Sequence, residues 1–140
     1  MTVSACWAAL RNAPVGRLAV AFDGQPDIFP INFTVDRGSV VFRTAEGTKL
    51  ALAAGRPVAF EADGYDPGTS EAWSVVVKGV ARVVGELEEV LDALDLPLFP
   101  WHTAPKSYIL RVEPDSMSGR SFTASTTGGS TPARRRAAPG

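Results

Sequence analysis

The sequence predicts a mainly β protein: an antiparallel sheet curled into a barrel, with two or three short helices packed against its outside. Segments that alternate like strands outnumber segments that repeat like helices. Most strand segments are joined by turns too short for a parallel crossover, which needs about a dozen residues. Hydrophobic residues make up 45% of the 140 residues and charged residues 21%, the balance of a globular domain with a substantial core. These observations favour a β-barrel with flanking helices.

The first element is a helix. Four apolar residues near the N-terminus recur at helical spacing, with Ser4 as the cap: Val3, Cys6, Trp7 and Leu10. Cys6 is then a core residue. The helix is expected to end at the Asn-Ala-Pro sequence of residues 12–14, because proline does not continue a helix.

Strand patterns follow along most of the remaining chain. Turn residues separate them, and the Asp-Arg-Gly sequence at 36–38 supplies the glycine of a hairpin. Glu61 and Asp63 alternate with apolar residues, which is the pattern of a strand with one face in solvent. The expected strands are 15–22, 28–35, 39–43, 58–62, 72–84, 107–112 and 117–122.

Two more helices are expected, together with one loop and a tail. Residues 49–54 form a short helix that a glycine and a proline end, and an amphipathic helix carries the apolar residues Leu87, Val90, Leu91 and Leu94. The loop 96–105 holds Trp101 and His102, either as a lid over a pocket or as a loop stapled by the indole. We expect one domain over 1–122 and a flexible tail over 123–140, because the tail has no large apolar residue beyond its start.

Charge and composition exclude several functions. The residues before the tail hold 11 basic and 15 acidic side chains, a net charge of −4, which disfavours a nucleic-acid surface. One cysteine and one histidine, Cys6 and His102, exclude an internal disulfide, a histidine triad and a clustered metal site within one chain. No apolar run reaches membrane-spanning length and the N-terminus lacks a secretion signal, so a cytoplasmic location is expected. No carboxylate pair indicates a catalytic acid and base.

The segment 40–50 is the most informative part of the chain. Arg43 and Thr44 come at the end of a strand, and Gly47, Thr48 and Lys49 at the start of a helix. Two cations, two hydroxyls and free N–H groups at a helix start favour a bound phosphate. The segment lacks the glycine and lysine spacing of a Walker loop, so a mononucleotide phosphate fits better than a triphosphate. The alternative is an ordinary turn with a surface lysine.

Two further segments have the character of a site for a planar ligand. Pro30 interrupts the ladder within 29–33, which frees backbone groups to bond a flat heterocycle, and Asn32 adds an amide. The alternative is a plain edge strand with Asn32 in solvent. Trp73 and Ser74 open the longest strand, where an indole stacks on a planar ligand, fills a subunit contact or packs in the core.

Taken in order, these segments resemble the pyridoxamine 5'-phosphate oxidase-like family of flavin-binding split barrels, and most closely its small actinobacterial-type members. The resemblance covers the chain from about Cys6 to Phe122. The C-terminal substrate-binding signature of the true oxidases is not evident, so the resemblance gives no support for vitamin B6 oxidation. It rests on Val15-Gly16-Arg17-Leu18, Phe29-Pro30-Ile31-Asn32-Phe33, Phe42-Arg43-Thr44, Gly47-Thr48-Lys49-Leu50, Trp73-Ser74-Val75 and Ser118-Gly119-Arg120.

The resemblance implies an antiparallel split β-barrel that forms a homodimer, with two FMN sites at the subunit interface. Four side chains would hold the ribityl phosphate, three would line the ring and ribityl chain, and two would come from the partner subunit. It implies no catalytic side chain and no metal ligand. The phosphate residues are Arg43, Thr44, Thr48 and Lys49, and those along the ring and ribityl chain are Ile31, Asn32 and Phe42. The residues from the partner subunit are Trp73 and Ser74, and Leu50 completes the cofactor-binding set.

The expected function is that of an FMN-dependent oxidoreductase with hydride transfer at the flavin and a small-molecule redox substrate that the sequence does not define. One alternative keeps the fold and takes an 8-hydroxy-5-deazaflavin coenzyme, with Arg56, Lys106 or Arg120 supplying an additional basic groove. Another is a protein that binds flavin or haem without catalysis. An axial haem ligand would come from His102, Cys6, Met1, Met117, Tyr65 or Tyr108.

Overall fold

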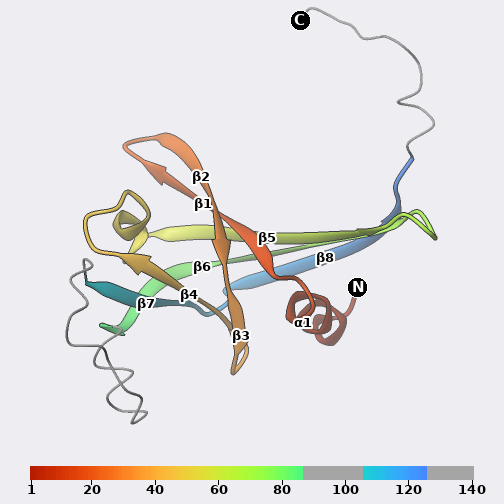
Figure 1. The fold of residues 1–140 in the computed structure, drawn as a ribbon, viewed down its shortest axis with the longest axis horizontal. Coiled ribbons are helices and arrows are strands. Elements are labelled where there is room, and N and C mark those ends of the chain that lie inside the picture. The colour runs from red at the N-terminus through yellow and green to blue at the C-terminus, as the bar shows by residue number, and fades with distance from the viewer. Residues whose placement is uncertain (87–105, 126–140) are drawn as a thin grey trace, which may run out of the picture.

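A computed structural model describes residues 1–86 and 106–125 (Figure 1). The predicted helix near residues 87–94, the loop 96–105 and all but the first residues of the tail lie outside this range. The elements are α1 (Val3–Arg11), β1 (Val15–Phe22), β2 (Gln25–Asn32), β3 (Thr34–Asp36), β4 (Ser39–Ala45), the 3₁₀ helix η1 (Leu50–Ala53), β5 (Pro57–Asp66), β6 (Glu71–Glu86), β7 (Ser107–Val112) and β8 (Ser116–Thr123).

The strands form one antiparallel sheet that bends round on itself. Its order is β2-β1-β5-β6-β7-β4-β3, and β8 pairs with β6 beside this path. The two ends of the path, β2 and β3, follow one another in the chain and are separated by Phe33 alone. The sheet therefore curls into a barrel that is open between two consecutive strands, which confirms the predicted mainly β, antiparallel split barrel.

Two hairpins bring neighbouring strands together as the turn residues require. Asp23 and Gly24 join β1 to β2, and Arg37 and Gly38 join β3 to β4. All four residues have positive φ angles, between 50° and 77°, as in the two-residue turns whose twist matches that of paired strands. Glycine adopts this backbone without strain, which is why it occupies the second position of each turn.

Three predicted elements differ from the observed ones. The strand expected at 28–35 is two strands, because the chain bends at Phe33 where it passes from one side of the barrel to the other. The helix expected at 49–54 is the four-residue η1, too short to be an α-helix. Helix α1 has Thr2 as its cap in place of Ser4, since the Thr2 hydroxyl accepts a hydrogen bond from the Ala5 N–H at 3.0 Å.

The core fills the barrel and the space beneath α1. Helix α1 lies against β8 and buries Cys6 and Leu10, as expected for Cys6. Gly119 of β8 is needed there, because a Cβ at that position would stand 2.4 Å from the Cys6 Sγ. The largest fully buried apolar side chains are Phe60, Leu10, Leu18, Leu110, Val40, Val75, Val77 and Val112.

Strands β5, β6 and β8 continue beyond the barrel as a three-stranded arm (Figure 1). Strand β6 is the longest, with β5 on one edge and first β8, then β7, on the other. The arm ends at the turn between β5 and β6, whereas η1 lies on the opposite side of the molecule.

No helix among residues 1–86 and 106–125 is long and apolar enough to cross a membrane.

Candidate functional site

The turn between β4 and η1 is built on two threonines. Thr44, buried at the end of β4, has its hydroxyl oxygen 3.1 Å from that of Thr48. The Thr48 hydroxyl donates its proton to the Ala45 carbonyl at 2.7 Å. Thr44 is therefore the donor between the two hydroxyls, and Thr48 accepts a second bond from the Ala51 N–H at 3.3 Å. This arrangement holds the turn in one conformation.

The turn supplies free backbone donors, although no helix dipole stands behind them. Gly47, at a φ of 81°, lies within the turn that reverses the chain after β4. Among residues 1–86 and 106–125 no hydrogen bond occupies the N–H groups of Gly47, Lys49 and Leu50. Because η1 has only four residues, any anion here would depend on these individual N–H groups and on side chains.

Hollows lie on both sides of this turn. One of about 360 Å³ is lined by Gly47, Thr48, Lys49, Ala51 and Leu52. A second, of about 210 Å³, is bounded on the strand side by Thr44, Tyr108 and Leu110, among others. The larger hollow is therefore lined by two of the residues with free N–H groups, Gly47 and Lys49.

Lys49 does not stand alone at this hollow. Its Nζ lies 2.5 Å from the Asp27 Oδ2 of β2, and the hydrogen bond from Lys49 lowers the pKa of the Asp27 carboxyl. Lys49 also lies over the Phe22 ring, 5.8 Å from its centroid. The Arg56 guanidinium lies over the same ring at 5.2 Å, with its Nε donating to the Leu52 carbonyl at 2.9 Å. Two cations and one carboxylate thus gather around Phe22.

Arg43, the other predicted phosphate cation, leaves β4 from the opposite face. Phe42 and Thr44 on either side of it are buried, and Arg43 is exposed, as alternation along a strand requires. Arg43 has no hydrogen-bond or ion-pair partner within the part of the chain that the structure describes. The structure thus brings Thr44, Thr48 and Lys49 together and leaves Arg43 directed away from Thr44.

The residues predicted to line a flavin ring are divided between core and surface. Ile31 and Phe42 are buried in the core, so only their backbone is available to a ligand. Asn32 is exposed at the end of β2, opposite Val15. Strand β2 is a plain edge strand, and its pairing with β1 runs unbroken through Pro30, opposite Arg17, so the expected interruption of the ladder is absent. Leu50, the first residue of η1, is partly buried.

Trp73 and Ser74 lie on the arm, far from the turn within one chain (Figure 1). Their side chains point to opposite faces of β6, so a single planar ligand would contact only one of them. Trp73 packs against Gly64, where a Cβ would stand 2.4 Å from the indole nitrogen. It also lines a hollow of about 450 Å³ near the tip of the arm.

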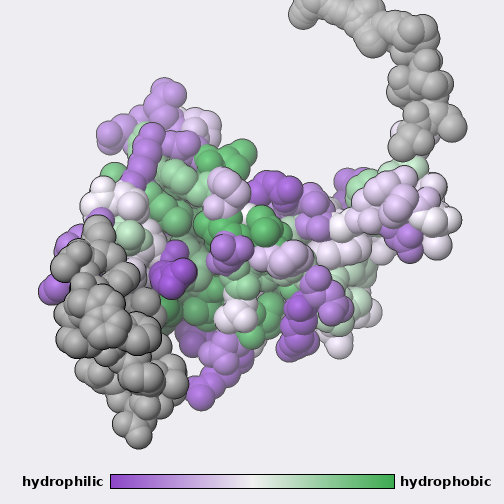
Figure 2. Space-filling model, viewed as in Figure 1, coloured by the Kyte–Doolittle hydropathy of each residue, from purple (hydrophilic) through white to green (hydrophobic). Residues whose placement is uncertain are grey.

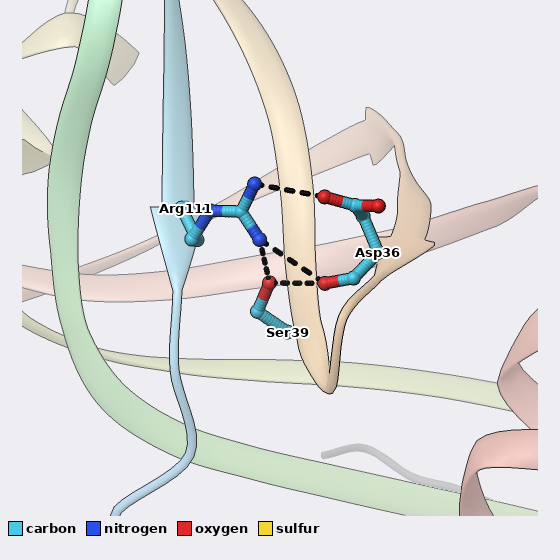
Figure 3. A network of polar contacts seen from close by, with 3 residues as sticks. All are labelled: Asp36, Ser39 and Arg111. Atoms are coloured by element: carbon cyan, nitrogen blue, oxygen red, sulfur yellow. Dashed lines mark hydrogen bonds and ion pairs between the residues drawn. The ribbon is translucent and has the colours of Figure 1, made fainter.

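A network that the sequence did not reveal fixes the β3–β4 hairpin on β7 (Figure 3). The Arg111 guanidinium bonds the Asp36 carboxylate at 2.9 Å, the Asp36 carbonyl at 3.1 Å and the Ser39 hydroxyl. Ser39 is fully buried and donates to the Asp36 carbonyl at 2.6 Å. The only signal for it was an arginine within the apolar 107–112 strand.

Outside this network and the threonine turn, the described residues hold few groups that suggest chemistry. No three or more histidine, cysteine, aspartate or glutamate side chains within 1–86 and 106–125 are arranged to hold a metal ion. The residues at the turn that sequence reasoning missed are Asp27 and Phe22. Both come from the β1–β2 hairpin, more than 20 positions before Lys49, so no local pattern links them to it.

Comparisons with known proteins give a consistent picture. The sequence model of the family described as pyridoxamine 5'-phosphate oxidase matches residues 2–121. The uncharacterized protein Rv0080 of Mycobacterium tuberculosis is 34% identical over 116 residues, which cover 79% of this chain and 76% of that protein. An FAD binding protein from Mycobacterium smegmatis, whose structure is solved, is 40% identical in sequence, with a TM-score of 0.70. The match covers 88% of this chain and 98% of that one.

A second solved structure is more distant in sequence and close in fold. An FAD-binding protein from Mesorhizobium loti is 26% identical, with a TM-score of 0.66. The match covers 86% of this chain and 93% of that one. The fold as a whole is therefore one that other chains share.

Proposed function

The chain belongs to the pyridoxamine 5'-phosphate oxidase family, and from this premise we propose that it is a flavin-dependent oxidoreductase that holds the flavin phosphate at the turn 44–49. The observation that carries the proposal is the turn itself. In the part of the chain that the structure describes, the N–H groups of Gly47 and Lys49 are unoccupied, and Gly47, Thr48 and Lys49 line a hollow of about 360 Å³. Oriented N–H groups with a nearby cation are the donor set that phosphate prefers.

The bound flavin would supply hydride transfer, and the protein's own part would be to bind and orient it. The Lys49 ammonium and the backbone N–H groups of Gly47 and Lys49 would hold the phosphate through charge-assisted hydrogen bonds, and the Thr48 hydroxyl would fix the shape of the turn. The edge of β2 near Asn32 would orient the ring with backbone groups. This division of labour agrees with the lack of a carboxylate pair that would serve as acid and base in the sequence.

A homodimer is part of the proposal, because one chain leaves the site incomplete. Trp73 and Ser74 lie on the arm, and one of the two side chains would contact a flavin at the turn if the arm belongs to a partner subunit. Figure 2 shows apolar residues gathered in the middle of the viewed face, with hydrophilic ones around them. Val15 and Ile28 are among the large apolar side chains left in solvent, 45% and 65% exposed, and a partner would cover such surface.

The choice of flavin is between FMN and FAD. The resemblance of the sequence implies FMN, whereas the two relatives that are FAD-binding proteins favour FAD. Fluorescence titration with FMN, FAD and an 8-hydroxy-5-deazaflavin coenzyme ranks the three ligands directly. The visible spectrum of the purified protein separates a flavin from haem.

The test of the site uses charge removal. The variant Lys49→Gln should lose FMN affinity by about tenfold while the far-ultraviolet circular dichroism stays unchanged. The matched control is Lys78→Gln, which removes one exposed ammonium from β6, away from the turn. Full flavin retention in the folded Lys49→Gln variant, or a wild-type protein that binds no flavin, would overturn the proposal.

A further inference from the structure

We propose that Asp27 is a resident competitor for the ligand phosphate: it occupies the Lys49 ammonium in the free protein and is displaced when the phosphate binds. The inference rests on the proposed function and identifies a residue that sets how strongly the site discriminates between phosphorylated and unphosphorylated flavin. Its basis is the ion pair between Lys49 Nζ and Asp27 Oδ2 at 2.5 Å.

Asp27 is placed for this role by the sheet. It lies opposite Val20 in the β1–β2 ladder, and Val20 is buried, so both side chains leave the sheet on the face that is turned to the core. That face carries Asp27 toward η1, where Lys49 stands. The Asp27 side chain is 33% exposed and that of Lys49 61%, so the pair is open to solvent, and Lys49 itself lines the hollow.

A carboxylate so close to the ammonium opposes a second anion. Lys49 carries one compact charge, and a phosphate brought to it would meet the negative charge of Asp27 at short range. Arg56, which lies over the same Phe22 ring as Lys49, has no carboxylate partner among the described residues. The only charge pair to be broken at the turn is therefore that of Asp27 with Lys49.

Removal of the carboxylate should tighten phosphate binding. We expect Asp27→Asn to lower the dissociation constant for FMN by about three- to tenfold, the range for an exposed charge pair together with the repulsion it relieves. Riboflavin, which has no phosphate, should bind the variant as it binds the wild type. In a Lys49→Gln background, Asp27→Asn should change FMN affinity by less than about twofold, because the ammonium for which both anions compete is gone.

Asp23→Asn is the matched control. It removes one carboxylate from the same hairpin, and asparagine tolerates the positive φ of 51° at that position. Asp23 has no ion pair among the described residues, so FMN affinity should stay at the wild-type value. If Asp27→Asn folds poorly, Asp27→Ser removes the same charge with a smaller side chain.

A second readout follows the carboxylate itself. Carbon-13 NMR of labelled Asp27 should show its titration moving to higher pH when FMN is added, because the carboxylate loses its ammonium partner. Suppose that the wild type binds FMN, that Asp27→Asn leaves FMN affinity unchanged, and that the Asp27 titration does not move when FMN is added. The inference is then overturned and the proposed function stands. Weaker FMN binding by Asp27→Asn would also overturn it, since Asp27 would then orient Lys49 for the ligand. A wild type that binds no flavin overturns both.

Discussion

The hydroxyl of Thr44, at the buried end of β4, donates a hydrogen bond of 3.1 Å to the hydroxyl of Thr48 in the turn that follows. The bond connects the barrel core to the residues that face the hollow. It leaves Thr44 with free acceptor capacity and Thr48 with its proton committed to Ala45. The shape of the turn therefore depends on a side chain that is itself out of solvent.

Replacing Thr44 with valine should remove this bond without changing the shape of the side chain. We expect the free energy of unfolding to fall by about 1 kcal/mol, because one part-buried hydrogen bond is lost. FMN affinity should fall with it, as the turn loosens. Urea denaturation and FMN titration measure the two effects. Thr44→Ser keeps the hydroxyl and should bind FMN like the wild type; equal losses in both variants would contradict the role of the bond.

Gly47 is held at a φ of 81°, a backbone that other residues adopt with strain. A Cβ at this position would meet no atom within 4 Å, so any effect of Gly47→Ala is conformational. We expect about 1 kcal/mol of destabilisation by thermal unfolding and a loss of FMN affinity. Gly47→Asn should lie between alanine and the wild type, because asparagine tolerates positive φ. An alanine variant with wild-type stability would show that the turn has another conformation available.

Ser39 tests whether the Asp36–Ser39–Arg111 network serves stability alone (Figure 3). Ser39→Ala leaves Arg111 with one acceptor fewer in a buried place, which should cost about 1 to 2 kcal/mol in urea denaturation. FMN affinity should not change, since the network lies at the β3–β4 hairpin. Ser121→Ala, at an exposed position of β8, is the control and should be neutral. A selective loss of FMN binding in Ser39→Ala would contradict this separation.

The pKa of Glu61 is raised above its ordinary value of 4.5, first by burial and then by the neighbouring Asp63, against the pull of Arg17. At pH values between 4.5 and the higher pKa of Glu61 in the folded protein, the folded protein binds more protons than the unfolded chain. Ionised Glu61 therefore costs stability above the folded pKa, and the cost disappears as the pH falls through that pKa toward 4.5.

Asp63→Asn should lower the pKa of Glu61, because it removes the like charge beside it and leaves the Arg17 contact at 2.8 Å in place. Carbon-13 NMR titration of the Glu61 carboxyl measures the change directly. Asp66→Asn, further along β5, should leave the titration where it is. An unchanged Glu61 titration in Asp63→Asn would mean that burial alone raises its pKa.

Local patterns in the sequence determined much of the fold. Alternation identified the strands of the sheet, and turn residues such as Gly38 marked the hairpins, because both depend on backbone preferences of a few adjacent residues. Short connections required antiparallel pairing, and Cys6 was expected in the core from helical spacing alone. The same alternation also separates Arg43 from Thr44, a signal that the phosphate hypothesis did not use.

Only the tertiary structure decided which distant residues meet at the candidate site. Asp27 reaches Lys49 because β2 crosses to the η1 side of the barrel, and Arg111 reaches Ser39 because β7 pairs with β4. Trp73 is carried away from the turn because β6 extends into the arm. The sequence by itself thus determined most of the strands, the turn and the residue types that we expect to bind phosphate. The charge balance around Lys49 was decided by strand pairing, because pairing is set by the burial of the whole sheet and not by any short segment.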